Sequence, residues 1–371
     1  MNDWHVRIAS IDLDNNNIQF DDDNKPKTNH GIDYAHLNAD SFTLKASDFV
    51  LNTDSIAAKI GEASFKEQSG FVLEQLQTDI LYASSQAYLK DLYLKTPGSE
   101  IKRYALLTYD SYNALINDPE KIRIDADIAN SYVQVKDILA FAPQLRSQPA
   151  FANPYAVWHL NLQGDGTLQS LYIRDLQFQG LKNTQLSAKG SLASATDPKR
   201  TGGKLYIQRL HTTQSDIALF TGSRLSTEQI SLPEEMDVNG SLSGSINNLY
   251  ADLNVNSSVG AATVQGRFTE LMDVKAVTYN AEVKTMGLNI GSIIKNKQLG
   301  KISGNMAVSG KGFTPDAAVK FKGNIYSIYY NGYDYRNITL NGNLQGSSFA
   351  AYTDIHDLLH FFLFFFLPFL L

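Results

Sequence analysis

The sequence IRIDADI at residues 122–128 decides the fold, because apolar and charged residues alternate along it. Successive side chains of an extended chain point to opposite faces, so Ile122, Ile124 and Ile128 would share one face and the charged residues the other. The same period of two, bounded by Gly, Asn or Asp, recurs at residues 277–283, 319–325 and 338–340. These segments are predicted to be half-buried β-strands.

The apolar positions of these strands are the candidate binding surface. If the strands curl into a trough, these side chains would face inward while the polar side chains alternating with them face water. The candidate groove-lining residues are Ile122, Ile124, Ile128, Val277, Tyr279, Val283, Val319, Phe321, Ile325, Ile338 and Leu340.

The composition supports a mainly β fold and excludes several kinds of site. Among 371 residues, 19 Tyr, 19 Phe and 25 Gly favour strands joined by tight turns. A net charge of -6 leaves no basic excess to neutralise a phosphate backbone, so no nucleic-acid partner is expected. The absence of cysteine excludes disulfides, thiolate nucleophiles and Cys-ligated metals.

Three short apolar windows interrupt the alternation and are predicted to be helices, at residues 136–142, 215–220 and 288–294. Each has an Asp or Asn placed to cap it, and Asp137, Asp216 and Asn289 are spaced by 79 and 73 residues. A similar Gly-containing strand follows each window, at residues 160–166, 236–244 and 306–312. The spacing predicts an elongated repeat protein whose units bury their apolar faces against one another.

Asn-rich and Asn-Gly segments are typical of tight connections, because both residues tolerate a positive φ. Such segments occur at Asn15-Asn16-Asn17, Asn331-Gly332 and Asn341-Gly342. The first two are predicted to be hairpin turns. The third is interpreted as a turn or, alternatively, a β-bulge.

The stretch KISGNMAVSGKG at residues 301–312 resembles the strand-Gly-x-Gly pattern of the TamB and AsmA-like envelope proteins of Gram-negative bacteria. The segments that continue this likeness are 325–327, 331–333 and 338–342, and those at 65–71 and 92–99 resemble the Bacteroidetes-type version of the family. The resemblance covers roughly residues 1–350 and carries no catalytic residue.

The resemblance implies a long curled sheet with an apolar interior that handles phospholipid acyl chains and supports outer-membrane protein assembly. It also implies a periplasmic location in the cell envelope, an inner-membrane anchor upstream of this sequence, and a TamA- or BamA-type β-barrel as a partner reached through regions not contained in it. The sequence is thus interpreted as an internal fragment of such a protein. Residues 1–130 would be an N-terminal β segment, residues 131–350 the groove repeats, and residues 351–371 an aberrant tail.

The motifs that suggest chemistry fail on detail, so neither an enzyme nor a cofactor or nucleotide site is expected. The segment Gly304–Lys311 is followed by Gly312, where a phosphate-binding loop needs Ser or Thr. Two imidazoles of the segment His356–His360 have metalloprotease spacing, but an Asp replaces the general base. A calcium-loop spacing includes Asp12, Asp14, Asn16 and Asp23 but lacks the required Gly, and a solvated hairpin tip is predicted instead.

The last 11 residues, 361–371, are apolar, too few to span a bilayer as a helix. They suggest a shifted reading frame or truncated gene, with a membrane-dipping anchor as the alternative. For the whole chain the expected function is to shield apolar cargo for lipid transport between two membranes. The alternative is a structural or adhesive β-repeat whose apolar faces close on each other and bind nothing.

Overall fold

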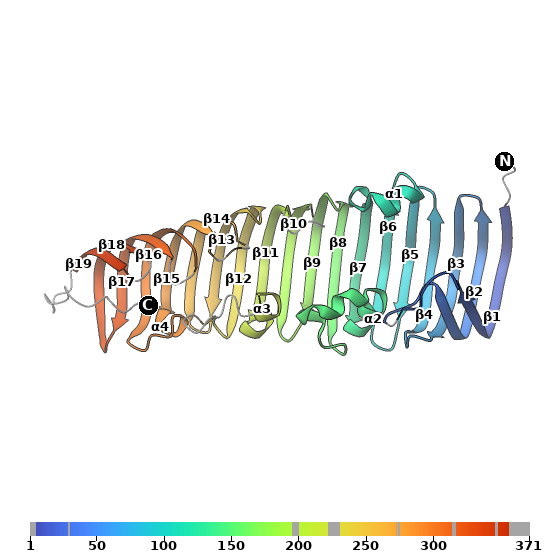
Figure 1. Cartoon of the computed structure of the whole chain (residues 1–371), viewed down its shortest axis with the longest axis horizontal. Helices are drawn as coiled ribbons and strands as arrows, with labels where there is room; N and C mark the ends of the chain where they lie inside the picture. The colour runs from blue at the N-terminus through green and yellow to red at the C-terminus, as the bar shows by residue number, and fades with distance from the viewer. Residues whose placement is uncertain are drawn as a thin grey trace. The chain divides into compact units, whose positions relative to one another are not determined.

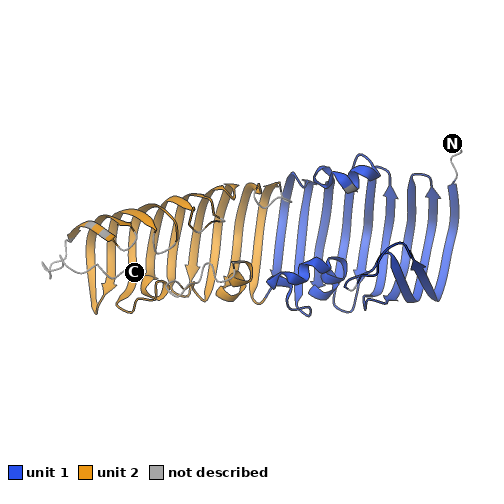
Figure 2. Cartoon of the chain, viewed as in Figure 1, with its two compact units in different colours: residues 1–181 blue, residues 182–371 orange. Residues whose placement is uncertain are grey.

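The computed structural model describes residues 5–28, 30–194, 200–221, 231–271, 273, 275–313, 317–345 and 348–355. The chain divides into two compact units, residues 1–181 and 182–371 (Figure 2). Each unit is described by itself.

Unit 1 consists of nine consecutive strands with short helices between some of them. The strands are β1 (His5–Asp21), β2 (His36–Asn52), β3 (Ser55–Glu67), β4 (Val72–Ala83), β5 (Gln86–Lys95), β6 (Glu100–Thr108), β7 (Arg123–Gln134), β8 (Val157–Thr167) and β9 (Ser170–Gly180). The α-helices are α1 (Tyr112–Asn117) and α2 (Val135–Phe141), and the 3-10 helices are η1 (Pro119–Lys121), η2 (Pro143–Ser147) and η3 (Pro149–Phe151).

Unit 2 continues in the same manner. Its strands are β10 (Thr184–Ala193), β11 (Gly202–Thr213), β12 (Glu235–Ser245), β13 (Asn248–Ser257), β14 (Gly260–Thr269), β15 (Thr278–Asn289), β16 (Leu299–Lys311), β17 (Ala318–Tyr330), β18 (Tyr333–Gln345) and β19 (Ser348–Ile355). Its helices are α3 (Gln214–Thr221) and α4 (Ile290–Ile293).

Every strand within a unit pairs antiparallel with its neighbours in the sequence, so each unit is a meander (Figure 1). The sheet is curled and does not close into a barrel. In unit 1 the curl coincides with β-bulges, at which residues such as Asn15, Asp91, Arg103 and Asn130 have positive φ. The predicted fold class, a curled antiparallel sheet with few short helices, is confirmed.

The structure corrects two of the three predicted turns. Asn331 and Gly332 connect β17 to β18 with φ values of 47° and 90°, as a tight hairpin requires. In contrast, Asn15-Asn16-Asn17 lies inside β1, where Asn15 (φ 51°) sits at a bulge opposite β2 and not at a hairpin tip. Asn341 and Gly342 lie in regular register with Lys322 and Phe321 and form neither a turn nor a bulge.

Helices α2, α3 and α4 occupy the three predicted windows, and four strands separate each helix from the next. The helices follow β7, β11 and β15, and β8, β12 and β16 contain the three predicted Gly-containing strands. The repeat read from the sequence is therefore one helix plus four antiparallel strands.

In helix α2 the predicted capping residue has a different role. The N-cap of α2 is Gln134, whose side chain makes no capping bond, and Asp137 lies buried in the first turn. Its carboxylate accepts hydrogen bonds from the Thr96 and Ser99 hydroxyls in the β5–β6 connection. The prediction that Asp137 caps α2 is wrong, because the short turn of a neighbouring hairpin provides better donors than the helix itself.

Asp216 of α3 makes the equivalent attachment in unit 2. Its side chain is 1% exposed and accepts from the backbone amides of Lys182 and Asn183 at 3.2 and 2.9 Å and from the Thr184 hydroxyl at 2.8 Å. Asn289 does cap α4, accepting from the Ser292 amide at 3.1 Å. Asp137 and Asp216 thus each bind their helix to the strand connection that lies two strands earlier in the sequence.

Residues 351–355 of the predicted tail belong to β19, which pairs with β18 from Ser348 to Ile355. The apolar segment 361–371 and the histidine pair His356 and His360 lie outside the described residues. The two compact units divide at residue 181, and the predicted division of the chain near residue 130 stays a prediction.

Candidate functional site: the apolar face of the sheet

The registers of unit 2 bring apolar residues and glycines together on one face of ten consecutive strands. One row across the strands is Ala188, Ile207, Gly240, Leu253, Val264, Val283, Met306, Gly323, Leu340 and Thr353. The next is Gly190, Leu205, Leu242, Ala251, Gly266, Ala281, Val308, Phe321, Gly342 and Ala351. We call this surface the apolar face.

The opposite face of the same strands, here called the outer face, is polar. Asn254 donates to Asn239 at 3.1 Å, and Thr263 donates to Asn254 at 3.1 Å, so a hydrogen-bonded ladder crosses β12, β13 and β14. Gln265 donates to Asp252 at 3.3 Å in the next row. Because one face is mostly apolar and the other mostly polar, a slip of one residue in register would exchange them, which favours a single register.

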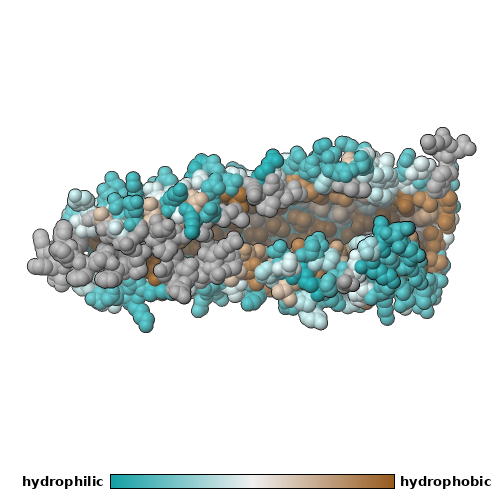
Figure 3. Space-filling model, in the orientation of Figure 1, coloured by the Kyte–Doolittle hydropathy of each residue, from teal (hydrophilic) through white to brown (hydrophobic). Residues whose placement is uncertain are grey.

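Unit 1 has the same two-faced organisation. On β7, Ile124 lies opposite Leu107 of β6 and Gly166 of β8, and Ile128 lies opposite Leu162 of β8. The apolar side chains line a hollow between polar rims, seen as the brown floor in the right half of Figure 3, the half that Figure 2 assigns to unit 1. The trough of unit 1 is therefore open on the side shown.

Nine of the eleven predicted groove residues lie on the apolar face of their unit, within strands β7, β15, β17 and β18. The two exceptions are Ile122 and Val277, which precede β7 and β15 and are 8% and 0% exposed. They are buried at strand ends and do not line the open part of the trough. Val277 is held there because its carbonyl accepts from the Gly312 amide at 2.7 Å.

In the middle of the apolar face the small residues Ala251 and Ala281 are 4% and 6% exposed, but the larger side chains on β13 to β15 are only half-buried. Leu253, Val264 and Val283 all fall in this class, although each is apolar and each lies in the interior of its strand. Burial becomes complete near α4, where Ile302, Ile325 and Ile338 form a cluster with exposures of 5–8%. The face is thus a closed core beside α4 and an uncovered surface along the strand centres.

Glycines keep this surface shallow, because large rings lie across them. A Cβ added at Gly310 would lie 2.6 Å from the Tyr279 hydroxyl, and one added at Gly342 would lie 2.7 Å from the Phe321 ring. The Tyr279 ring therefore packs over Gly310 of β16, and the Phe321 ring packs over Gly342 of β18. Burial there also raises the pKa of the Tyr279 hydroxyl.

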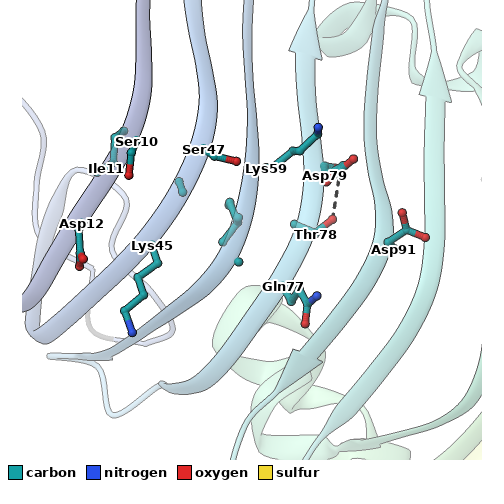
Figure 4. Close-up of a pocket in the computed structure, with 13 residues that line it drawn as sticks. Ser10, Ile11, Asp12, Lys45, Ser47, Lys59, Gln77, Thr78, Asp79 and Asp91 are labelled. Atoms are coloured by element: carbon teal, nitrogen blue, oxygen red, sulfur yellow. Dashed lines mark hydrogen bonds between the residues drawn. The ribbon is translucent and has the colours of Figure 1, made fainter.

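A second, polar depression of about 500 Å³ lies over strands β1 to β5 of unit 1 (Figure 4). The charged side chains that line it are Asp12, Lys45, Lys59, Asp79 and Asp91. Lys45 and Lys59 are bound by Glu62 at 3.0 Å and Asp48 at 3.1 Å. These hydrogen bonds raise the pKa of both lysines, so neither is available as a base or nucleophile at neutral pH. The depression is thus a polar hollow of the surface in which both lysines are held in ion pairs.

The histidines and acidic residues singled out in the sequence do not converge. No group of three or more His, Asp or Glu side chains within the described part of the chain is placed to hold a metal ion. His36 pairs with Asp33 at 3.1 Å, and His211 pairs with Asp237 at 3.2 Å, in different units. Asp12, Asp14 and Asn16 lie along strand β1, and Asp23 follows it.

The comparisons with known proteins give no family assignment. Neither a protein-family model, nor a curated protein, nor a solved structure matches this chain. The resemblance to the TamB and AsmA-like family therefore stays a prediction. Among the described helices none is long and apolar enough to cross a membrane.

Sequence reasoning missed much of the apolar face in β10 to β14. Strands β12 and β14 contribute Gly240, Gly244 and Gly266 at inward positions, which hides the alternation. The signal that could have found them is alternation in which glycine counts as apolar, as in the sequence VNGSLSG at residues 238–244.

Proposed function

We propose that this protein shields apolar cargo, and specifically phospholipid acyl chains, in the trough formed by the apolar face. The observation that supports this function is the row of inward-facing residues that stays half-buried from β12 to β18 while the opposite face of the same strands is mostly polar. Exposed apolar surface of this extent marks a site for an apolar ligand or partner.

The energetics suit an acyl chain. Each buried methylene is worth about 0.8 kcal/mol, so a 16-carbon chain would gain on the order of 10 kcal/mol over water. Four strands, the length of one repeat, span roughly 19 Å across the sheet at about 4.8 Å per strand. Half of a bilayer's hydrocarbon core is roughly 15 Å thick, so each repeat is long enough to cover one acyl chain.

The proposal extends to lipid transport between the inner and outer membranes, or support of outer-membrane protein assembly, with a TamA- or BamA-type β-barrel as partner. This extension is supported only by the resemblance of residues 301–312 and the related segments to the family. Movement along the trough would be passive, since the apolar face holds no group that could couple it to a chemical step.

A closed structural repeat is the competing function, and the buried cluster of Ile302, Ile325 and Ile338 favours it locally. The two functions differ in whether the strand centres admit a ligand. The chain contains no cysteine, so a single introduced thiol can be labelled cleanly.

The test compares Val264→Cys with Gln265→Cys, neighbours on opposite faces of β14. Each variant is labelled with an environment-sensitive fluorophore and titrated with phospholipid and with a fatty acid. Shielding of acyl chains predicts a blue shift at position 264 and none at position 265. Equal responses at the two positions, or none at either, would contradict an open trough and favour the closed repeat.

A further inference from the structure

The outer face of strands β15, β16 and β17 in unit 2 carries a cluster of cations, separate from the apolar face. Five exposed lysines lie on these three strands or at their ends: Lys284, Lys301, Lys311, Lys320 and Lys322. The one carboxylate on the same face of these strands is Glu282. We call these five residues the lysine patch.

The registers place the lysine patch on a single surface. Lys284 lies opposite Asn305 of β16, which lies opposite Asn324 of β17, and Lys322 is two residues along β17 from Asn324. Lys320 lies opposite Ser309, and Lys311 lies opposite Ala318. Lys301 precedes Ile302 of the buried cluster and so points away from the apolar face.

Salt bridges are fewer in the lysine patch than in unit 1, where some of the lysines form one and others do not. In unit 1, Lys45, Lys59 and Lys95 each form an ion pair with a carboxylate at 3.0–3.3 Å. Within the described residues, no salt bridge involves a lysine of the patch. Five like charges on neighbouring strands repel one another, and an anionic partner would relieve that repulsion.

Two exposed amphipathic or apolar side chains accompany the charges. Met286, two residues after Lys284 on β15, is 77% exposed, and Tyr326 on β17 is 58% exposed. A face that only contacts water gains no free energy from exposing these two side chains. Lysine beside exposed tyrosine and an aliphatic side chain is the combination found at membrane–water interfaces, where the ring and the alkyl group enter the headgroup layer.

We infer that the lysine patch, with Met286 and Tyr326, docks the outer face of β15–β17 onto an anionic phospholipid bilayer. Lysine is a flexible point charge and suits a diffuse layer of headgroup phosphates. Lysine also binds nucleic-acid phosphates, but a phosphate backbone gives an exposed aliphatic side chain such as Met286 no apolar layer to enter, which favours a bilayer. The inference does not depend on the proposed function, because the docking residues lie on the face opposite the trough.

The test measures co-sedimentation of the whole chain with vesicles of phosphatidylcholine alone and of phosphatidylcholine mixed with phosphatidylglycerol. Docking predicts binding to the mixed vesicles only, and its loss in high salt, where the screening length falls to about 3 Å at 1 M. Equal binding to both kinds of vesicle, or binding that survives high salt, would overturn the inference.

The double variant Lys284→Glu/Lys322→Glu should weaken binding to the mixed vesicles by at least roughly 30-fold, since each lysine near an anionic surface contributes about 1 kcal/mol. Its matched control is Lys189→Glu/Lys204→Glu, which makes the same charge change on β10 and β11 of unit 2 and should bind as the wild type does. Circular dichroism checks that both variants fold. A double variant that binds normally would refute the docking surface. If the chain binds duplex DNA more tightly than vesicles and the double variant loses that binding, the lysine patch is a nucleic-acid site and the membrane inference is refuted.

Discussion

Replacing Asp216 with alanine tests whether the buried carboxylate of α3 holds the β9–β10 connection in place. The side chain is 1% exposed and accepts two backbone amides and one hydroxyl, from Lys182, Asn183 and Thr184. Removing the acceptor leaves the two backbone amides without this partner at about 1–3 kcal/mol each, roughly 3–4 kcal/mol together, whereas the Thr184 hydroxyl keeps the Thr212 hydroxyl as a partner at 2.9 Å.

The loss should be local, because each repeat contacts mainly its neighbours. Native-state hydrogen exchange of the Lys182 and Asn183 amides measures it directly. We expect their protection to fall by two to three orders of magnitude, at about 1.4 kcal/mol per tenfold change. Asp216→Asn keeps one acceptor oxygen and should fall between the wild type and Asp216→Ala. Glu282→Ala, at an exposed position of the same unit, should leave these amides unchanged. A decrease of less than tenfold in Asp216→Ala would refute the anchoring role.

Three further predictions follow from the same structure. Leu253→Asp, on the apolar face of β13, should weaken acyl-chain binding roughly 30-fold by removing about 2 kcal/mol of apolar contact. Asn254→Asp, on the outer face, should leave the binding unchanged, and titration with a fluorescent fatty acid measures both variants. Ile302→Ala should lower the free energy of unfolding by about 2–4 kcal/mol in urea titrations, because Ile302 is 6% exposed within its cluster, and an unchanged midpoint would contradict the packing. The Thr28 amide donates to the Asp33 carboxylate at 2.7 Å and lowers the pKa of that carboxyl from its usual value of 3.8. The hydrogen bond therefore stabilises the loop fully above pH 3.8, and this stabilisation is lost as the pH falls through the pKa of the folded state. Exchange protection of the Thr28 amide should decrease on acidification, and Asp33→Asn should remove the dependence.

The alternation in the sequence was sufficient to predict the fold class and the spacing of the repeat. Residues 122–128 have Ile, Ile, Ala and Ile at every second position, and the registers place Ile124 and Ile128 on the apolar face of unit 1. The alternation could not be recognised where glycine occupies inward positions, as at Gly240 and Gly244. Glycine is needed there because the backbone of the neighbouring strand approaches too closely for a side chain.

The position of β-bulges and of the helix anchors could not be predicted from local pattern. Asn15 tolerates positive φ equally in a turn and in a bulge, and the choice depends on how β1 pairs with β2. The role of Asp137 depends on Thr96 and Ser99, which are about forty residues earlier in the sequence. Both are decided by tertiary pairing, for which a single sequence contains no direct signal.

The most direct test of the central claim is to purify the chain from bacteria, extract it with organic solvent, and identify any bound phospholipid by mass spectrometry against a denatured control. Shielding of acyl chains predicts phospholipid in stoichiometric amount, retained in Asn254→Asp and depleted in Leu253→Asp. A wild-type chain that is folded, soluble and free of lipid would contradict the account and favour a structural repeat.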